Sequence, residues 1–340
     1  MRALVIDSIG HSVLREVETA EPKPGEVQIS VRHVGLCGSD LATFTGMNPL
    51  VHLPRIPGHE IGGEIVAVGS NVDGAFRVGR RVVVLPYTSC GTCSSCRKGR
   101  VNACRYNRTL GVQQDGGLAD YIALPAEKII FNDTLPPRQL ALVEPLSVGF
   151  HAVRRGRVAK DDKVAVLGCG MIGMGVILAS AAKGAEVIAI DVSEKKLEIA
   201  RRFGAAHIIC GGSEDVAANI STLTGGDGAD VVVEAVGSPD TFVQAVDLAC
   251  FSGRVVYIGY SKAPVTYDTK FFNLKELDIF GSRNATLEDF GAAIAHLERL
   301  GDGANELISR IFPFEEADQA LPFWLGKRPE TLKIVIERQG

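Results

Sequence analysis

The chain of 340 residues is 46% hydrophobic and carries a formal net charge of −4 at pH 7. This length favours two domains, and the small negative charge argues against nucleic acid or an anionic membrane as the main partner. The N-terminal stretch MRALVIDSIG has no signal-peptide pattern, and no apolar run approaches the roughly 18 residues of a membrane span. We therefore expect a soluble, cytoplasmic protein whose partner is a small molecule.

The chain up to about residue 150 predicts a compact β-rich unit. Short β-type segments follow one another between Gly and Pro residues, namely VQISVRHVG, GGEIVAVG, RRVVVLPY and DYIALP. Few helical periods occur before residue 139. The pattern favours a barrel-like arrangement of short strands.

From Lys163 onward the pattern changes to alternating strands and helices. The segments KVAVLG, MIGMGVILASAAKGA, EVIAID and SEKKLEIARRFGA have the spacing of strand, helix, strand and helix. The apolar segments ADVVVEAVG, GRVVYIGY and LDIFGS continue the series, as expected for a parallel sheet covered on both faces. We expect an α/β doubly wound sheet of six strands here.

After Arg283 the sequence predicts a helix (LEDFGAAIAHLERLG), a second helix around FEEADQALPFW, and a final strand, LKIVIERQ. This tail is too small to fold alone. We expect it to return to the first domain, which would make that domain discontinuous.

The segment GCGMIG, residues 168–173, follows a predicted strand and opens a predicted helix. Gly168, Gly170 and Gly173 permit a tight turn and a close approach of the backbone to a pyrophosphate, whose charge the helix N-terminus attracts. Asp191 ends the next strand, where a carboxylate accepts a hydrogen bond from a ribose 2′-hydroxyl. The pattern predicts a dinucleotide-binding site.

Asp191 also bears on the choice of dinucleotide. A carboxylate at this position repels the 2′-phosphate of NADP, and no arginine follows it directly. The nearest basic residues are Lys195 and Lys196, and Lys196 can reach the adenosine ribose without reading a phosphate. We therefore favour NAD over NADP.

Four cysteines are close together in SCGTCSSCRKGRVNAC, namely Cys90, Cys93, Cys96 and Cys104. Because the chain is long and lacks an export signal, its eight cysteines do not indicate a disulfide framework. Four thiolates suit a closed tetrahedral zinc site that fixes a polar loop. An iron–sulfur cluster is the alternative, although the spacing matches neither common ferredoxin pattern. Three further cysteines, Cys169, Cys210 and Cys250, are expected to be small buried hydrophobes.

His59 and Glu60, in GHE, place an imidazole and a carboxylate side by side. Such a pair alone is more often part of a capped turn than a pair of ligands. With Cys37 upstream and Glu144 downstream, however, the chain offers nitrogen, oxygen and sulfur ligands, a set that suits zinc better than calcium or magnesium. A catalytic zinc needs about three protein ligands and one open position.

The motifs CGSD, GHE, ALVEPLSVGFHAVRRG and GCGMIG, together with the four-cysteine segment, resemble the zinc-dependent medium-chain alcohol dehydrogenase/reductase family over essentially the whole chain. EPLSVGFHAVRRG resembles the sorbitol (polyol) dehydrogenase branch. GSRNAT and GVQQDGG are similar to sugar-acid members such as L-galactonate 5-dehydrogenase. The resemblance implies a GroES-like β-rich catalytic domain, residues 1–148 and 285–340, and a Rossmann dinucleotide-binding domain, residues 149–284.

The resemblance also implies two zinc ions per chain, a catalytic one and a structural one on the four cysteines. The catalytic zinc would be held by Cys37 and His59, with Glu60 as third ligand and Glu144 bound directly or through water. The polyol branch favours Glu60, whereas other branches place a ligand at the position of Glu144. Both assignments stay open at this point.

Two residues after Cys37 match family positions with a catalytic role. Asp40 corresponds to the carboxylate that orients the ligand histidine, and the alternative is a helix N-cap. Ser39 corresponds to the hydroxyl that takes the alcohol proton, and the alternative is a turn serine. Glu144 offers a second proton route as general base.

The family also implies cofactor and substrate contacts. The expected cofactor-binding residues are Gly168, Gly170, Met171, Ile172, Gly173, Asp191, Lys196, Gly237, Ile258, Gly259, Ser282 and Arg283. The expected substrate-binding residues are Thr43, Arg283 and Asn284. Arg283 can grip a hydroxyl or a carboxylate, although an arginine at a strand end is often only solvated.

The chain departs from the polyol branch near Cys37. A histidine and a tyrosine commonly stand five and six residues beyond this cysteine, where the chain has Ala42 and Thr43. Asn284 replaces a frequent aromatic residue after the family arginine. We expect a substrate pocket that is roomier and more polar than that of sorbitol dehydrogenase, with more proton flux through Glu144.

These observations predict a zinc- and NAD-dependent enzyme that oxidises a secondary hydroxyl of a polyol or sugar acid to a ketone. An L-threonine-type or other secondary-alcohol dehydrogenase is the alternative. A non-catalytic relative that binds NAD and zinc is disfavoured because Cys37, His59, Glu60 and Glu144 are all present. The family suggests a homodimer or a homotetramer.

Overall fold

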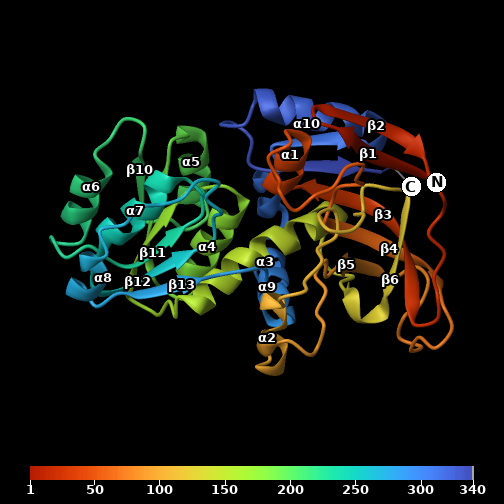
Figure 1. Ribbon diagram of the computed structural model, residues 1–340, viewed down its shortest axis with the longest axis horizontal. Coiled ribbons are helices and arrows are strands. Elements are labelled where there is room, and N and C mark those ends of the chain that lie inside the picture. Colours follow the sequence, from red (N-terminus) through yellow and green to blue (C-terminus); the bar gives the residue numbers. More distant parts are fainter. Residues whose placement is uncertain (339–340) are drawn as a thin grey trace. The chain divides into compact units, whose positions relative to one another are not determined.

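The computed structural model describes residues 1–338, which form two compact units (Figure 1). Unit 1 contains Met1–Glu144 and the chain from Phe290 onward, and unit 2 contains Pro145–Asp289. The expected borders of the functional domains, at residues 148 and 285, stay a prediction. Two helices contain the borders between the units, α3 (Leu140–Arg155) and α9 (Leu287–Leu300).

Unit 1 is built on a seven-stranded sheet in the order β14-β15-β3-β4-β5-β7, with β6 paired to β3. Its strands are β3 (Glu26–Leu36), β4 (Glu60–Val68), β5 (Arg81–Val84), β6 (Tyr121–Pro125), β7 (Ile129–Phe131), β14 (Arg310–Pro313) and β15 (Ile334–Glu337). A separate hairpin pairs β1 (Arg2–Ser8) with β2 (His11–Glu16). Figure 1 shows the blue C-terminal strands beside the orange β3, so the tail completes the first sheet, as expected.

Short helices connect and cover these strands. They are α1 (Gly38–Phe44), α2 (Ser94–Arg97), α10 (Ala317–Gly326) and the 3-10 helices η1 (Val101–Ala103), η2 (Ala126–Lys128), η3 (Pro137–Gln139), η4 (Gly301–Leu307) and η5 (Phe314–Glu316). The core of unit 1 joins apolar side chains of the strands to those of α1 and α10, among them Phe44, Ile61 and Trp324.

The register of three neighbouring strands determines where the site forms. Gly35 of β3 is paired with Glu60 of β4, and Leu36 of β3 is paired with Ile334 of β15. Cys37 follows β3 directly and Lys333 precedes β15 directly. The ends of these strands therefore bring together residues that lie far apart in the sequence.

Unit 2 is a six-stranded parallel sheet in the order β10-β9-β8-β11-β12-β13, which confirms the predicted α/β doubly wound fold. Its strands are β8 (Lys163–Leu167), β9 (Glu186–Asp191), β10 (His207–Cys210), β11 (Ala229–Glu234), β12 (Ala249–Tyr257) and β13 (Asp278–Gly281). Its helices are α4 (Met171–Ala182), α5 (Glu194–Arg202), α6 (Val216–Leu223), α7 (Pro239–Leu248) and α8 (Lys270–Leu274). The sheet runs outward from β8 in both directions, which makes the β8/β11 border the switch point.

No helix within residues 1–338 has both the length and the apolar character needed to cross a membrane. The longest helix, α3, has 16 residues.

Candidate functional site

Cys37, His59 and Glu60 form a compact cluster in unit 1. One potential ligand atom of each side chain lies within 4.8 Å of the others. Glu60 is fully buried and His59 is 6% exposed. The strand register explains how Glu60 fits, because a Cβ at Gly35 would lie 1.9 Å from Glu60 Oε2. Glycine opposite Glu60 thus leaves room for its carboxylate.

The electrostatics of this cluster suit a bound cation. Burial lowers the pKa of His59, but Cys37, Asp40 and Glu144 outweigh burial and raise that pKa well above its ordinary value. The buried Nδ1 of His59 has no hydrogen-bond partner within the described chain. Negative groups that gather around a histidine, with a thiol, a carboxylate and an imidazole within reach of one point, fit a zinc ion.

Lys333 also reaches Glu60, a contact that no local sequence pattern predicted. Its Nζ donates to Glu60 Oε1 at 2.6 Å, to Glu60 Oε2 at 2.5 Å and to the Leu36 carbonyl at 2.8 Å. Lys333 is 2% exposed. Burial raises the pKa of Glu60 to about 7, even though the attraction of Lys333 opposes that rise. Only the pairing of β15 with β3 could have revealed this contact.

Glu144 lies in α3 and accepts a hydrogen bond from the Tyr87 hydroxyl. Both side chains are buried, and Tyr87 was not predicted. Burial and the Glu144 carboxylate raise the pKa of Tyr87 well above its ordinary value, so Tyr87 stays protonated and donates. Within the described chain, the ligand cluster that includes Cys37 and His59 contains Glu60 and not Glu144.

Ser39 and Asp40 lie in the first turn of α1. Asp40 Oδ2 accepts from the Cys37 backbone N–H at 2.8 Å, and Asp40 Oδ1 accepts from the Gly58 N–H at 3.3 Å. Asp40 Oδ1 lies 4.0 Å from His59 Nδ1, which is beyond hydrogen-bond distance. Asp40 therefore ties the cysteine loop to the histidine loop through backbone groups. The buried Ser39 Oγ has no partner among residues 1–338.

Thr43 follows one turn later in α1. Its hydroxyl donates to the Ser39 carbonyl at 2.9 Å and accepts from Asn48 Nδ2 at 3.2 Å. Its hydroxyl is thus engaged by neighbouring groups of the chain. Ala42, which precedes Thr43, is half-buried. Its methyl group stands where the polyol branch has a histidine side chain.

The four cysteines of the loop between β5 and β6 also converge. Their ligand atoms lie within 4.8 Å of one another, with Cys93 Sγ 3.5 Å from Cys96 Sγ and 3.9 Å from Cys104 Sγ. A tetrahedral zinc with Zn–S bonds of about 2.3 Å separates its sulfurs by about 3.8 Å. Hydrogen bonds from Ser95 and from backbone amides lower the pKa of Cys93 to about 5, which favours a thiolate. The geometry and chemistry of this loop fit zinc.

The glycine motif of unit 2 has the geometry that a dinucleotide needs. Gly168 has a φ of +95°, where side chains are strained, and a Cβ at Gly173 would lie 1.8 Å from the Gly168 carbonyl oxygen. A Cβ at Gly170 would meet nothing within 4 Å, so the space beside it is open. Met171 and Ile172 begin α4 directly after Gly170, which is its N-cap. This arrangement fits a pyrophosphate, and we call it the dinucleotide cradle.

Asp191 closes β9 beside this cradle. Its Oδ2 accepts from the Cys169 N–H at 2.7 Å and its Oδ1 accepts from the Ser193 N–H at 2.9 Å. These bonds fix the carboxylate at the end of β9, where the sequence predicts a contact with a ribose. Lys196 lies on α5, the helix that follows Asp191.

The remaining expected cofactor residues lie at the ends of β11, β12 and β13. Gly237 has a φ of +84°, and a Cβ at Gly259 would lie 2.5 Å from the Gly237 nitrogen, so both positions need glycine. Ile258 is buried, and the buried Ser282 Oγ has no partner within residues 1–338. The expected substrate residues Arg283 and Asn284 follow Ser282 on the same loop, and both are half-buried.

The three other cysteines differ in exposure. Cys169 is fully buried, as predicted, and burial raises its pKa. The prediction is wrong for Cys210 and Cys250, which are only partly buried. Cys210 ends the edge strand β10, and Cys250 lies near the start of β12, before its buried middle section.

Comparison with known proteins identifies the family. Residues 23–133 match the alcohol dehydrogenase GroES-like domain family, and residues 172–299 match the zinc-binding dehydrogenase family. The L-galactonate-5-dehydrogenase of Escherichia coli is 34% identical over 99% of this chain and 98% of its own length. The sorbitol dehydrogenase of Bacillus subtilis is 33% identical over 99% of this chain and 97% of its own length.

A solved structure agrees with these relatives. An Escherichia coli alcohol dehydrogenase in complex with NADH has a TM-score of 0.90 and 29% identity, and the match covers 99% of each chain. The metal-ligand clusters and the dinucleotide cradle are thus found in a chain similar over its full length to zinc dehydrogenases. The chain belongs to the zinc-dependent medium-chain alcohol dehydrogenase family, and it is an NAD-dependent enzyme with two zinc ions per chain.

Proposed function

We propose that this enzyme oxidises a secondary hydroxyl of a polyol or a sugar acid to a ketone, with NAD as the acceptor. The observation that carries the proposal is the cluster of Cys37, His59 and Glu60. The charge of Glu144 acts on His59, and the Tyr87 hydroxyl donates a hydrogen bond to that carboxylate. The names of the two relatives, a sugar-acid dehydrogenase and a polyol dehydrogenase, support this substrate class.

In this proposal Cys37, His59 and Glu60 hold the catalytic zinc, and Cys90, Cys93, Cys96 and Cys104 hold the structural zinc. When bound, the catalytic zinc supplies Lewis acidity that lowers the pKa of an alcohol hydroxyl. Asp40 keeps the cysteine and histidine loops in register through the backbone N–H groups of Cys37 and Gly58. Asp40 therefore positions His59 through the backbone and acts on its ring by charge, without a hydrogen bond to it.

Two residues of the chain can move the alcohol proton. The buried Ser39 Oγ, unpartnered within the described residues, can accept a hydrogen bond from a substrate hydroxyl. The Glu144 carboxylate can act as general base, and Tyr87 holds it in place. Ala42 lacks the imidazole that would extend the Ser39 route, so we propose that Glu144 carries more of the proton flux.

Arg283 and Asn284 are the proposed substrate contacts of unit 2. A guanidinium can hold a carboxylate by two parallel hydrogen bonds, and an amide can both donate to and accept from a hydroxyl. These groups suit a sugar acid or a polyol better than an apolar alcohol. Thr43 contributes mainly its methyl group and its bulk, because its hydroxyl is engaged with Ser39 and Asn48.

Gly168, Gly170, Gly173 and Asp191 are the core of the proposed NAD site. The carboxylate of Asp191 favours NAD over NADP by charge repulsion. Further cofactor contacts are proposed for Met171, Ile172, Lys196, Gly237, Ile258, Gly259, Ser282 and Arg283. A cytoplasmic location, where thiols stay reduced, and assembly into a homodimer or homotetramer belong to the same proposal.

The test is a screen for NAD reduction by the zinc-loaded enzyme over C4 to C6 polyols, aldonates and their L-isomers, with L-threonine as competitor. We expect NADH formation with at least one polyol or aldonate, and a lower kcat/KM for L-threonine. Activity on L-threonine with none on polyols or sugar acids would overturn the proposal in favour of an amino-alcohol dehydrogenase.

A further inference from the structure

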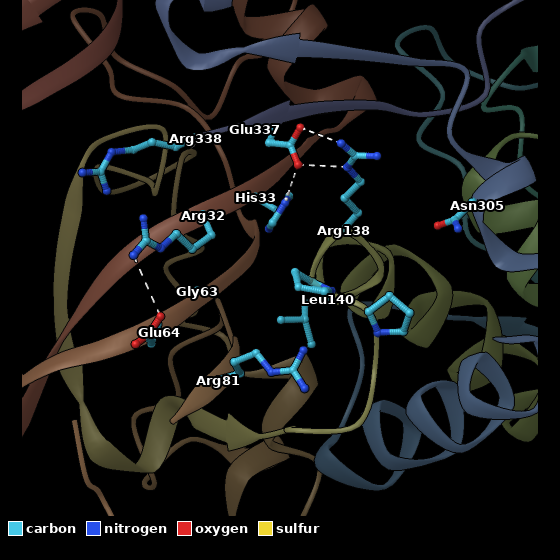
Figure 2. Close-up of a pocket in the computed structure, with 12 residues that line it drawn as sticks. Arg32, His33, Gly63, Glu64, Arg81, Arg138, Leu140, Asn305, Glu337 and Arg338 are labelled. Carbon is cyan, nitrogen blue, oxygen red and sulfur yellow. Dashed lines mark hydrogen bonds and ion pairs between the residues drawn. The ribbon is translucent and has the colours of Figure 1, made fainter. Parts of the chain in front are cut away.

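Ion pairs in unit 1 connect different kinds of segment. Beside a cavity of about 760 Å³, Arg138 of η3 donates two hydrogen bonds of 2.9 Å to Glu337 of β15 (Figure 2). At the same cavity, Arg32 of β3 lies 3.9 Å from Glu64 of β4. These pairs connect regular elements, which their own backbone hydrogen bonds already hold in shape. An ion pair between two loops has a larger effect on position, because a loop lacks such a ladder and moves more easily.

Asp115 forms such a pair with Arg55. Its Oδ1 accepts from Arg55 Nη1 at 2.9 Å and from the Ile56 backbone N–H at 3.1 Å. Arg55 and Ile56 lie on the loop between α1 and β4, which ends at His59. Asp115 lies on the loop between η1 and β6, in the segment GVQQDGG. One carboxylate oxygen thus joins this segment to the loop that carries a proposed zinc ligand.

The two loops stay in contact over the residues before His59. Residues 56–58 have three backbone C=O groups and two N–H groups, because proline has no N–H. Residues 115–118 bond to both C=O and N–H groups of this stretch, and Asp40 accepts from the Gly58 N–H at 3.3 Å. Besides the bond to Asp115, the bonds between the loops run from Gly116 N–H to the Ile56 carbonyl at 2.7 Å, from Leu118 N–H to the Pro57 carbonyl at 3.0 Å and from Gly117 N–H to the Gly58 carbonyl at 2.9 Å. Every backbone polar group of residues 56–58 is therefore held by another part of unit 1.

The glycines of GVQQDGG let the two loops approach each other closely. A Cβ at Gly116 would lie 2.3 Å from the Gly58 carbonyl oxygen, and a Cβ at Gly111 would lie 2.7 Å from the Gly58 nitrogen. The close contact is thus between backbones. Asp115 adds a side chain that reaches across it.

The imidazole of His59 takes its position from this loop. Its Nδ1 has no hydrogen-bond partner within residues 1–338, and Asp40 Oδ1 lies 4.0 Å from it, beyond hydrogen-bond distance. Because no such bond fixes the ring, its place depends on the backbone that carries it. Asp115 acts on that backbone at Ile56.

We propose that Asp115 is a positioning residue for the catalytic zinc. It holds Arg55 and Ile56, and thereby keeps the His59 imidazole in place for the metal. The inference rests on the proposed function in one respect, that His59 binds the catalytic zinc, and it does not depend on the substrate. Removing a group that orients a metal ligand commonly weakens metal binding about 10–100-fold.

The test is the rate of zinc release from the zinc-loaded, full-length protein into an excess of pyridylazoresorcinol, a chelator that changes colour on binding zinc. The release that Cys37→Ser lacks is that of the catalytic site, and the four-cysteine site is the internal reference. We expect Asp115→Ala to raise the release rate of the catalytic site at least about ten-fold. The rate of the four-cysteine site should not change.

Asp133→Ala is the matched control. Asp133 is another exposed aspartate of unit 1, and it also accepts from one backbone N–H, that of Arg81 at 3.1 Å, and from one arginine, Arg80 at 2.9 Å. It lies between β7 and η3, on a segment without a proposed metal ligand. We expect its loss to leave both release rates unchanged, which separates positioning of the ligand from a general loss of stability.

Two further variants divide the contact. Asp115→Asn keeps an oxygen that can accept from the Ile56 N–H, so its release rate should stay closer to that of the wild type than the rate of Asp115→Ala. Arg55→Met removes the guanidinium and leaves the bond to Ile56, so it should raise the catalytic rate by a smaller factor. Arg55→Met still tests the inference if Asp115→Ala does not fold.

An unchanged catalytic release rate in Asp115→Ala, or in Arg55→Met where Asp115→Ala does not fold, would overturn the inference. An equal rise at both zinc sites, or the same rise in Asp133→Ala, would overturn it as well. A wild type that releases no more zinc than Cys37→Ser would contradict the proposed catalytic zinc itself, and this inference with it.

Discussion

Glu60 has two possible counter-ions, the Lys333 ammonium and a zinc ion. The ammonium lies within 2.6 Å of both carboxylate oxygens, and the ligand atoms of Cys37 and His59 lie within 4.8 Å of the same carboxylate. A fully buried carboxylate needs at least one such partner. Lys333 can thus compensate Glu60 when the metal is absent.

If Lys333 and zinc both compensate the charge of Glu60, Lys333→Met should destabilise the metal-free protein more than the zinc-loaded protein. Without metal, the variant has an uncompensated buried carboxylate and should lose about 3 kcal/mol or more of unfolding free energy. With zinc bound, the metal charge replaces the ammonium, so the loss should be less than half as large. The difference is measured by denaturant unfolding of the metal-free and zinc-loaded forms.

Lys327→Met is the control, because the Lys327 ammonium is exposed and its ion pair with Glu330, at 3.6 Å, lies at the surface. It should change stability by less than about 0.5 kcal/mol. An equal loss in the two forms of Lys333→Met would show that Lys333 and zinc do not share the charge of Glu60.

Glu144 is the residue on which the proposed proton route depends. Glu144→Gln keeps the size of the side chain and an acceptor for Tyr87 but removes the general base, so kcat should fall about 100-fold. The pH–rate profile should lose its dependence on a basic group. Tyr87→Phe keeps the carboxylate and removes one hydrogen bond, which predicts a fall of about ten-fold. An unchanged rate and pH profile in Glu144→Gln would assign the proton to Ser39 instead.

At the scale of elements, the Asp289 carboxylate holds the start of α9 by hydrogen bonds. Asp289 Oδ2 accepts from the Thr286 N–H at 2.8 Å, and Asp289 also accepts from His151 and Arg154 of α3. Burial opposes ionisation of Asp289, but the bonds from His151, Arg154 and Thr286 outweigh burial and hold its pKa well below its usual value. Asp289 thus joins α9 to α3 in its ionised form.

We predict that Asp289→Asn lowers the unfolding free energy by about 2–4 kcal/mol at pH 7. A carboxyl whose pKa is depressed by folding stabilises the native state above its unfolded pKa of about 3.9. That stabilisation is lost as the pH falls through the lower, native pKa. The difference between wild type and variant, measured by urea unfolding, should therefore shrink below about pH 4.

Glu288→Gln is the matched control, because Glu288 is a neighbouring carboxylate with a 72% exposed side chain and an ion pair to the same Arg154. Its effect should stay below about 1 kcal/mol. A difference for Asp289→Asn that is constant from pH 7 to pH 3 would contradict the role given to its charge.

The elements also show what the sequence could and could not predict. Local patterns were enough to predict the βαβ series and the glycine turn of unit 2. The hydrophobic period of a strand or helix, the spacing of the glycines and the positive φ of a turn all depend on residues that are neighbours in the sequence. The helix α1 and the contacts of Tyr87 and Lys333 were missed. Lys333 reaches Glu60 only because β15 pairs with β3, and a contact such as that of Lys333 with Leu36, 297 positions apart, leaves no local signal.

At the scale of the molecule, each compact unit has its own site-forming residues. Unit 1 holds both cysteine-containing clusters, and unit 2 holds the dinucleotide cradle. The two metal clusters of unit 1 are built on different elements, one at the end of β3 and the start of β4 and the other on the loop between β5 and β6. We therefore expect the two zinc ions to bind independently.

The most direct test of this account is the zinc content per chain of the wild type and of Cys37→Ser, measured by elemental mass spectrometry on folded protein. We predict about two zinc ions for the wild type and about one for the variant, because the four-cysteine loop does not depend on Cys37. Loss of both ions, or of neither, in a variant that keeps its fold would contradict two independent zinc sites and the catalytic role of the Cys37 cluster.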